Sequence, residues 1–588
     1  MKIKKQVLLL LLMVAGVLGL ADHLAAQETQ SPGQTPEGSL LPEIDPQDIE
    51  IRSHYSARFP GLRRQPILGF APGSRVFQVD PDRTPFLEDL TEIAAQLPVG
   101  ELGRPEAPPY RPFPYADSSI GYGRLGIGSY FSPKADLWLN HSLSEDHLLT
   151  GSFNHRSGGS HLDHSSSFRD LDLEGSWRGK LSESSVMGVT ASVSSDFNHL
   201  PYIGSGTFED DLDTGRKSYT GFQGETRFRR YSNRIEHLEI GVRASYDLID
   251  LDEEIYALSG EQSDWRVGGD ASYTWAGSNI DEIIMLSADL QAGGYSMSKE
   301  GGTPLASDPY LYSGLDSANW HLLGVGGTWQ RLFNYRTRLH TTLAGYHASD
   351  VSSAKFYIAP RIQLDHYATD FLTFAASIEG KPEMTGAVEH HRENRFLLPY
   401  HHQRNSYNMK ADVQVMLEPI ANNQIRAGVS YLNSSRHPVF VRDGGGSSGH
   451  YRLTYESVTI PRAFAGIGVD LIRERLWFDV EAFYQNPRIS DDQKLPYAGD
   501  FGLTGSISLR PASRLLFEAW GEFMGPRESP GGEDLGSYLN LGSRLEIKLT
   551  DRIGAYGKLV NLLGQQYELF EGYPERPLQI YGGITFHL

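Results

Sequence analysis

Five residues in one stretch of the chain carry side chains that transition metals prefer. They are Glu389, His390, His391, His401 and His402, and they lie between two segments in which apolar and polar residues alternate. Neutral imidazoles bind divalent transition metals, and a carboxylate can complete the coordination. Neighbouring histidines meet at one ion only if the loop that carries them folds back on itself. The stretch is therefore either a metal site or a solvated polar loop.

Two acidic clusters lie in other connections between alternating segments. One runs from Glu209 to Asp213, and the other runs from Asp250 to Glu254. Carboxylate oxygens suit calcium, but neither cluster has the spacing of an EF-hand loop. We favour the alternative, in which these residues are solvated or bridge lipopolysaccharide through cations.

Other kinds of chemistry find little support in the sequence. Residues Gly121 to Gly126 match the letters of the dinucleotide fingerprint G-x-G-x-x-G, but the pattern that follows is a strand pair and not a helix. No Ser-His-Asp arrangement stands out among the many accidental candidates. The chain has no cysteine, which removes disulfides, thiolate metal sites and a cysteine nucleophile. We therefore predict neither an enzyme nor a cofactor.

The end of the chain shows which kind of element positions these residues. Leu578 to Leu588 alternates throughout, with Ile584 and Phe586 on one face and Thr585 and His587 on the other. Its length is that of a transmembrane β-strand, about 9–11 tilted residues. A single strand in lipid would leave backbone groups unpaired, so the rest of the chain must supply a closed barrel.

The same alternation repeats from residue 119 to 588 as hairpin after hairpin, with short turns at one end and longer loops at the other. We count about 22 strands, an even number as in bacterial barrels. The predicted fold class is all-β, a large transmembrane antiparallel β-barrel. A soluble sandwich, with its apolar face buried on a second sheet, is the alternative. The charged residues that alternation turns toward the lumen in the last strands are Arg510, Glu518, Arg544, Glu546 and Lys548.

Composition excludes two other classes of protein. Only 39% of the residues are hydrophobic, and no apolar run after the N-terminus reaches the roughly 20 residues of a membrane-spanning helix. The net charge of −20 argues against a nucleic-acid partner, which would require a basic face.

The first 118 residues have a different character. Residues 1–26 read as a signal peptide, with a lysine-rich start, an apolar core and Ala25-Ala26 before the predicted cleavage site. Residues 27–118 form a Pro-rich extension in the periplasm or lumen, with one short helix predicted near 85–97.

The C-terminal region resembles the end of TonB-dependent outer-membrane receptors. That family has a V-x-N-L-F-D-x-x-Y run, then a G-Y-P loop and the last strand. Lys558 to Glu568 reads K-L-V-N-L-L-G-Q-Q-Y-E, and Gly572-Tyr573-Pro574 follows in the same order. Gly564 departs from the pattern, because an acidic residue or Asn is usual there. The residues that resemble the C-terminal signal by which the barrel assembly machinery recognises outer-membrane barrels are Tyr581, Gly583, Phe586 and Leu588.

The resemblance implies a multi-pass protein of the bacterial outer membrane, in contact with lipids and lipopolysaccharide. It also implies a plug of well over a hundred residues, but 27–118 is too short and too Pro-rich to be one. We expect the N-terminal region, inward-folded loops or a partner subunit to fill the lumen. The alternating residues Asp48, Ile49, Glu50, Ile51 and Arg52 are a small edge strand, a disordered tail or the box through which such receptors pair with TonB.

Two functions remain open at this point. The first is an outer-membrane transport barrel of the TonB-dependent receptor type, for the uptake or passage of a solute. The second is a non-transporting barrel that anchors a surface or envelope complex through a periplasmic or surface partner.

Overall fold

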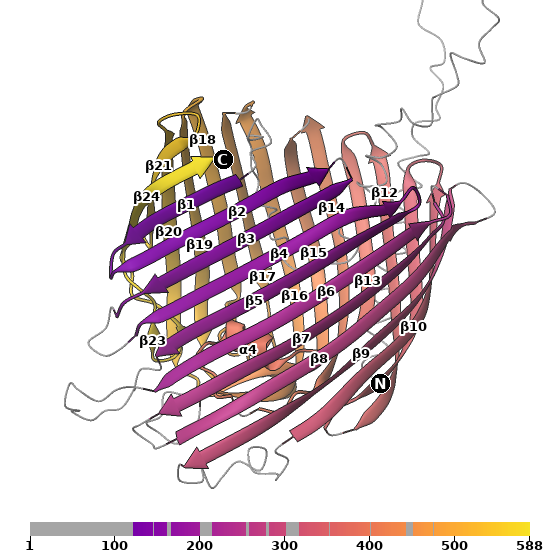
Figure 1. The fold of residues 1–588 in the computed structure, drawn as a ribbon, viewed down its shortest axis with the longest axis horizontal. Coiled ribbons are helices and arrows are strands. Elements are labelled where there is room, and N and C mark those ends of the chain that lie inside the picture. The colour runs from indigo at the N-terminus through magenta and orange to yellow at the C-terminus, as the bar shows by residue number, and fades with distance from the viewer. Residues whose placement is uncertain are drawn as a thin grey trace, which may run out of the picture. The chain divides into compact units, whose positions relative to one another are not determined.

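A computed structural model describes residues 121–587, apart from breaks at 145, 161–165, 200–214, 234, 254–257, 278–280, 302–316, 352, 400, 421, 443–450 and 474. These residues form a closed sheet of 22 antiparallel strands (Figure 1). β1 (Gly121–Gly128) closes the barrel by pairing with β24 (Gln579–His587), in register from Tyr122↔His587 to Gly128↔Tyr581. The predicted fold class and strand number are confirmed.

The strands between these two follow one another around the wall, each paired with the next. Their bounds are β2 (Ser132–Ser144), β3 (His147–Gly158), β4 (Phe168–Ser182), β5 (Ser185–His199), β6 (Arg216–Tyr231), β7 (His237–Glu253), β8 (Leu258–Ala276), β9 (Glu282–Gly301), β10 (Ser317–Phe333), β11 (Thr337–Ser349), β12 (Ala354–Thr369), β13 (Leu372–Met384), β14 (Asn405–Ile420), β15 (Asn423–Arg442), β16 (Tyr451–Ile472), β17 (Leu476–Gln485), β18 (Phe501–Ala512), β19 (Leu515–Glu528), β20 (Asp534–Lys548) and β21 (Ile553–Val560).

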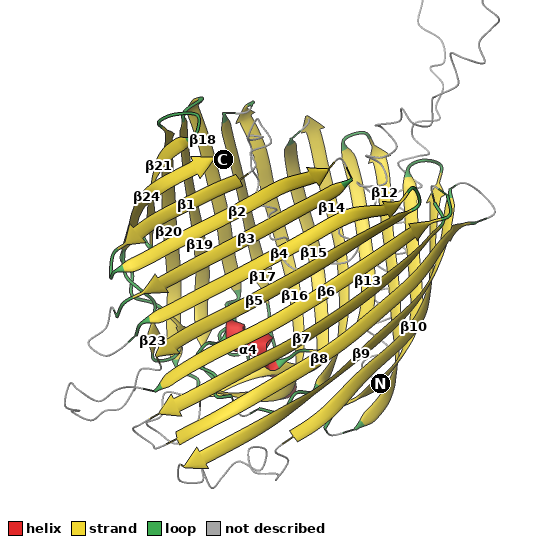
Figure 2. Ribbon diagram, viewed as in Figure 1, coloured by secondary structure: helices red, strands yellow, loops and turns green. Residues whose placement is uncertain are grey.

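The connections between the wall strands contain a small hairpin and two short helices. β22 (Glu568–Phe570) and β23 (Tyr573–Pro574) form a separate hairpin before β24. A 3-10 helix, η2 (Ser490–Asp492), follows β17, and one α-helix, α4 (Ala387–Glu393), lies between β13 and β14 (Figure 2). None of the helices in the described ranges is long and apolar enough to cross a membrane.

Short turns join the strands at the end where β1 begins and β24 ends. The β10–β11 turn, for example, places Asn334 and Tyr335 at φ angles of 51° and 55°, a left-handed backbone that asparagine tolerates well. The longer connections all lie at the other end. In bacterial barrels short turns face the periplasm, so the longer connections, including the one that carries α4, are extracellular.

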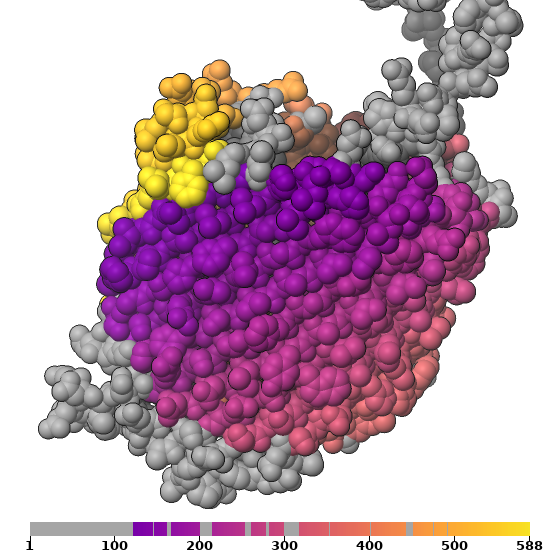
Figure 3. Space-filling view, viewed as in Figure 1, coloured from indigo at the N-terminus to yellow at the C-terminus, as the bar shows by residue number. Residues whose placement is uncertain are grey.

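The wall has an apolar outer face and a charged inner face. On β20, Leu545 and Ile547 are about two-fifths exposed, whereas Glu546 between them is buried. The strands seen in Figure 3 pack into a continuous outer surface. The 22 strands form one closed sheet, and no second sheet in the described ranges covers these apolar side chains. The sandwich alternative is therefore wrong, and lipid is the solvent that suits this face.

Several strands are longer than their alternation predicts. The sequence suggests strands at 425–432 and 463–472, but β15 extends to Arg442 and β16 begins at Tyr451. These extensions lie at the extracellular end and contain Pro438 and polar residues. Beyond the lipid, backbone pairing no longer requires apolar residues at every second position, so the pattern fades while the strands continue.

Candidate functional site

The connection between β13 and β14 folds into the barrel and does not extend into solvent. Its residues 385–404, here called the inward segment, contain α4 and several fully buried side chains, among them His390, Asn394 and Gln403. Figure 2 shows α4 between the near and far walls of the barrel. The segment contacts β5, β6, β8 and β9 on one side and β16 and β23 on the other, as described below. The expectation of a solvated loop here is wrong, because this stretch is packed against the inner wall.

An arginine on the wall fixes the start of the segment. The Arg266 guanidinium on β8 donates from Nη1 and Nη2 to the two Glu389 carboxylate oxygens at 2.9 and 2.8 Å, and from Nη2 to Asp264 at 3.1 Å. The Glu389 carboxylate also accepts the Gly386 backbone N–H at 3.0 Å. A Cβ on Gly386 would overlap the guanidinium, so glycine is what lets Arg266 reach the helix.

The middle of the segment is held by a buried lysine. Lys217, at the extracellular end of β6, is fully buried and donates from Nζ to the Leu397 carbonyl at 2.6 Å. Arg392 reaches in the same direction and donates to the Ser194 hydroxyl on β5 at 3.2 Å. Burial, together with the nearby Arg395 charge, lowers the pKa of Lys217 well below its usual value, and the hydrogen bond to Leu397 ties the segment to this wall.

The neighbours of Leu397 in the middle of the segment pair with the opposite wall. The Leu398 N–H donates to the Tyr451 carbonyl at 2.8 Å, and the Tyr451 N–H donates to the Phe396 carbonyl at 3.1 Å. The Phe396 ring stacks on Tyr573 of the β22–β23 hairpin, and the Tyr451 hydroxyl donates to the Glu571 carbonyl at 2.8 Å. The last long connection therefore closes over the same place, and the two form one apolar cluster.

The five residues of the predicted metal site lie at different places in this packing. Glu389 is engaged by Arg266, His402 contacts the Tyr295 hydroxyl at 2.9 Å, and His391 packs near the Tyr219 ring. Only His390 and His401 face each other, with ring centroids 5.6 Å apart. In the described part of the chain no three His, Cys, Asp or Glu side chains come together as a metal site would require.

Many buried polar atoms around the segment have no hydrogen-bond partner within the described protein. They include both ring nitrogens of His390, Nε2 of His401 and the side-chain amide nitrogen of Asn394. Buried polar groups are normally satisfied, and each exception destabilises the packing by about 1–3 kcal/mol. These are the groups that water would satisfy if the segment moved away from the wall.

Burial keeps three histidines of the segment, His390, His391 and His401, neutral at pH 7. Burial lowers the pKa of His390 to about 4 and that of His401 to about 3, and it lowers the pKa of His391 well below its usual value. Burial opposes ionisation of Glu389 as well, but its hydrogen bonds to Arg266 outweigh that effect and lower its pKa. The segment thus carries one ionised clamp and three uncharged imidazoles.

The residues predicted to line the lumen lie on the last strands near the periplasmic end. Arg544 forms an ion pair with Glu518, and Arg510 donates to the Ser513 carbonyl at 3.2 Å beside the turn. Glu546 and Lys548 follow on the same face of β20, opposite Leu545 and Ile547. Their part in conducting a solute stays a prediction. The stretch Asp48 to Arg52, the signal peptide, the helix near 85–97 and the acidic cluster at 209–213 lie outside the described residues.

Sequence reasoning missed the residues that hold the segment. Lys217, Asp264, Arg266 and Tyr451 belong to strands and are ordinary barrel residues in the sequence. One signal was available, the apolar run Phe396-Leu397-Leu398-Pro399 inside an otherwise polar connection. An apolar run in an extracellular loop needs a surface to cover it.

Comparisons with known proteins show the fold alone. No family model matches the chain, and no curated protein matches its sequence. Among solved structures, the copper transporter OprC matches with a TM-score of 0.62 at 13% identity, covering 80% of each chain. The ferric enterobactin receptor PfeA of Pseudomonas aeruginosa matches at 0.61 and 10% identity, covering 80% of this chain and 81% of its own. The siderophore receptor PiuA of Acinetobacter baumannii matches at 0.62 and 7%, covering 80% and 82%.

These neighbours bear out the resemblance that the C-terminal motif suggests. All three are transporters or receptors by name, and none is named as an enzyme. Their likeness covers four-fifths of the chain. The chain therefore has the receptor-type barrel fold of bacterial outer-membrane proteins, and its 22 strands cross that membrane.

Proposed function

We propose that this chain is an outer-membrane transport barrel that admits a solute through its lumen, and that the inward segment is its extracellular gate. Barrels of this strand number are wide enough to pass solutes and must be obstructed to stay closed. The observation that carries the proposal is the segment itself, which reaches from Lys217 on one wall to Tyr451 on the other.

The contacts of the segment are of a kind that can be broken and remade. Among the described residues, two backbone hydrogen bonds join it to the strand extension at Tyr451, and its other contacts given above come from side chains. Several of its buried polar groups are unsatisfied and would regain hydrogen bonds from water on opening. Elements that move in function come from such regions of low local stability. A permanent seal would be expected to satisfy these groups.

The partners follow from the same proposal. The barrel would lie among outer-membrane lipids and lipopolysaccharide after insertion by the barrel assembly machinery. Energy from TonB through residues 48–52 stays a prediction from the sequence, as does any periplasmic or surface partner. The siderophores and copper named for the similar structures belong to those proteins, and the solute of this chain is a separate question.

A reversible cross-link tests the gate. Leu397 and Tyr451 form a parallel bridge pair, so their Cα atoms are about 5 Å apart, within the range that a disulfide spans. The chain contains no other cysteine, so the double variant Leu397→Cys with Tyr451→Cys has one possible disulfide. Conductance in planar bilayers and the swelling of liposomes in sugar solutions are measured on the same protein, oxidised and then reduced.

Reduction is expected to raise conductance and sugar entry, and reoxidation to abolish the rise. The two single-cysteine variants are matched controls and should not respond to reductant. Equal conductance in both states would show that the segment is not the gate. A barrel that passes no solute in either state, and that purifies with a fixed partner, would favour the anchoring function instead.

A further inference from the structure

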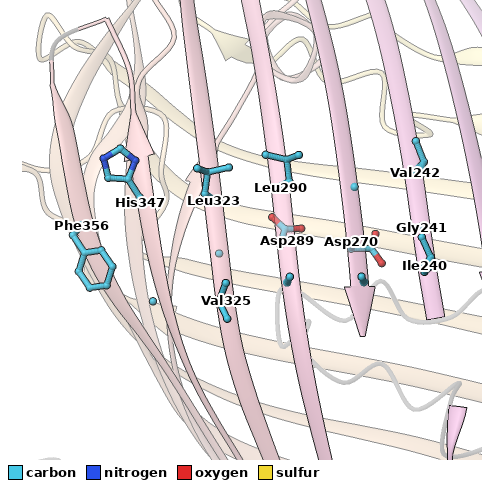
Figure 4. Close-up of a pocket in the computed structure, with 15 residues that line it drawn as sticks. Ile240, Gly241, Val242, Asp270, Asp289, Leu290, Leu323, Val325, His347 and Phe356 are labelled. Atoms are coloured by element: carbon cyan, nitrogen blue, oxygen red, sulfur yellow. The ribbon is translucent and has the colours of Figure 1, made fainter. Parts of the chain in front are cut away.

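The outer surface of the barrel has an apolar hollow over the neighbouring strands β7 to β12. The hollow has a volume of about 730 Å³, within the range of sites that hold a small molecule. Its lining includes small residues such as Gly269, Ala271 and Ala288. Larger side chains such as Leu290 and Phe356 line it as well (Figure 4).

The hollow faces lipid and not the lumen. Leu290, Val325 and Phe356 along its rim are exposed by 50%, 70% and 69%, as expected for side chains that point away from the barrel. Asp270 and Asp289 also line the hollow, but they alternate with these apolar residues, and the Asp289 carboxylate accepts a hydrogen bond from Gln291 at 3.1 Å on the other face of β9. Hydrocarbon is therefore the medium that fills the hollow in the membrane.

A histidine pair lies at one edge of this hollow. His347 lines it, in a row with Leu290 and Leu323 (Figure 4). Its Nδ1 is 3.0 Å from Nε2 of His321, and Nδ1 of His321 is 2.8 Å from the Ser349 hydroxyl. That hydroxyl also accepts the His321 backbone N–H at 3.2 Å. With Ser349 donating to His321, each ring carries its proton on Nε2, and His347 presents an N–H to the outer surface.

The height of the pair on the wall identifies the leaflet that it meets. His347 lies about ten residues above the periplasmic turn that starts β11. At about 3.3 Å per residue and a tilt of about 40°, that is roughly 25 Å, the height of the apolar band of such barrels. His347 therefore lies at the upper edge of the hydrocarbon, where outer-leaflet headgroups begin.

We propose that the hollow and the His321–His347 pair form a binding site for lipopolysaccharide, with an acyl chain in the hollow and a lipid A phosphate on the exposed Nε2 of His347. Polar side chains on the lipid face cost stability, and a hydrogen-bonded chain of three of them requires a partner there. A phosphate supplies that partner, because a neutral or protonated imidazole donates to it in a charge-assisted hydrogen bond. The outer leaflet supplies the phosphorylated lipid.

Two variants test the two halves of the site in the full chain. Gly269→Leu fills the hollow, and a Cβ at this position meets only the Gly241 carbonyl at 3.7 Å, an ordinary contact. His347→Leu removes the donor and leaves an apolar side chain toward lipid, so it should not lower thermal stability. Gly175→Leu and His141→Leu are matched controls, because both residues lie on the outer face outside the hollow, Gly175 has open space beside it and His141 is exposed.

Each protein is purified from outer membranes, and its bound lipid is measured by native mass spectrometry. Rebinding is then measured with lipid A that carries or lacks its phosphates. The wild type and both controls should retain lipopolysaccharide, whereas Gly269→Leu and His347→Leu should lose about tenfold in affinity, the effect of one charge-assisted hydrogen bond or an equivalent loss of apolar contact.

Removal of the phosphates should weaken binding to the wild type and leave His347→Leu unaffected. Unchanged migration of the folded barrel on unheated gels shows that each variant is assembled. Equal lipid retention in all variants would overturn the proposal. Preferential retention of glycerophospholipid, or equal binding of dephosphorylated lipid A by the wild type, would overturn it as well. Neither result depends on whether the barrel transports a solute.

Discussion

The β1–β24 seam and the inward segment are both long-range contacts, but they are built in opposite ways. The seam joins the two ends of the barrel through seven consecutive register pairs. The segment instead relies on an arginine clamp, a buried lysine and two backbone hydrogen bonds. The seam pairs backbone with backbone, whereas the segment leaves several buried side-chain nitrogens without partners among the described residues.

The difference fits the proposed gate, in which a permanent wall carries a part that moves. Lipid offers no hydrogen bonds, so a wall that opened at a seam would leave backbone groups unpaired in hydrocarbon. The segment lies at the extracellular mouth, where water can replace each contact that it loses. Assembly of the wall should therefore be sensitive to substitutions that disturb the approach of neighbouring backbones. Docking of the segment should be sensitive to changes in charge.

The largest effect is expected at Gly583 on the seam. A Cβ at this position would lie 2.1 Å from the Leu125 carbonyl oxygen on β1, which is backbone and cannot move aside. Gly583→Val should prevent closure of the barrel, at a cost above the about 1–3 kcal/mol of ordinary overpacking. The folded, heat-modifiable band on unheated gels should disappear.

Gly582 is the matched control, next to Gly583 in the same strand. The atom nearest to a Cβ there is the Tyr556 carbonyl oxygen at 4.0 Å, and the side chain would point to lipid. Gly582→Leu should assemble normally. Equal assembly of both variants would mean that the seam does not depend on this close approach.

The wall could be predicted from the sequence in greater detail than the segment. Alternation between apolar and polar residues located 22 strands and their short turns, because lipid requires an apolar residue at every second position of each strand. That requirement ends above the membrane, which is why the extensions of β15 and β16 escaped prediction. The lumen charges on β20 followed from the same alternation.

The inward segment has no such periodic requirement. α4 has seven residues, two of them histidine, and its place depends on Arg266 and Asp264 from a strand more than a hundred positions earlier. Local sequence cannot show contacts of that kind, and short helices depend on tertiary packing. The histidines that suggested a metal site are buried by these contacts, and only His390 and His401 face each other.

The next largest effect is expected from the clamp. Arg266→Met removes both hydrogen bonds to Glu389 and leaves the Asp264 carboxylate, 1% exposed, without its cation. Breaking one side of a buried ion pair destabilises by about 3–5 kcal/mol. The segment should leave the wall while the barrel stays folded, and hydrogen exchange at 385–404 should become fast.

Arg227→Met is the control for the loss of an arginine. Arg227 pairs with Glu239 at 2.9 Å, but it is half exposed and lies on β6 away from the segment. Exchange at 385–404 should not change in this variant. Slow exchange in Arg266→Met would show that the clamp does not hold the segment.

Acid should release the segment without any mutation. Released histidines have a pKa near 6.5, whereas burial lowers the pKa of His390 to about 4 and that of His401 to about 3. The released state therefore binds more protons, and docking weakens as the pH falls from about 6.5 toward 4. Each histidine contributes about 1.4 kcal/mol per pH unit in this window.

Charged groups of both signs lie near the His390 and His401 rings and act on their protonation. Glu389 favours protonation of His390, while Arg266 and His437 oppose it, and Lys217 opposes protonation of His401. Hydrogen exchange of 385–404 at pH 7.5, 6 and 5 should accelerate with acid in the wild type and less so in His390→Leu. An acceleration of the same size in both would assign the effect to other groups.

The smallest effect on stability is expected from substitution of a charged residue on the lumen face of the wall. Arg544 and Glu518 form an ion pair on the lumen face, with side chains 19% and 24% exposed. Such a pair contributes about 1 kcal/mol or less, so Arg544→Gln should leave barrel stability almost unchanged. The loss of a positive charge near the periplasmic end should instead shift the reduced, open channel of the cysteine-pair protein toward cations, because charged side chains that line a pore set its selectivity.

Reversal potentials in a salt gradient measure this shift, and Arg510→Gln provides the comparison. Arg510 bonds to the Ser513 carbonyl beside the turn, so its charge lies at the rim and should influence selectivity less. A larger shift for Arg510→Gln would place the narrow part of the path at the periplasmic rim. A loss of stability in Arg544→Gln comparable to that of Gly583→Val would contradict the distinction between a wall held by its backbone and a segment held by side chains. Lumen side chains would then stabilise the wall as much as its backbone pairing does.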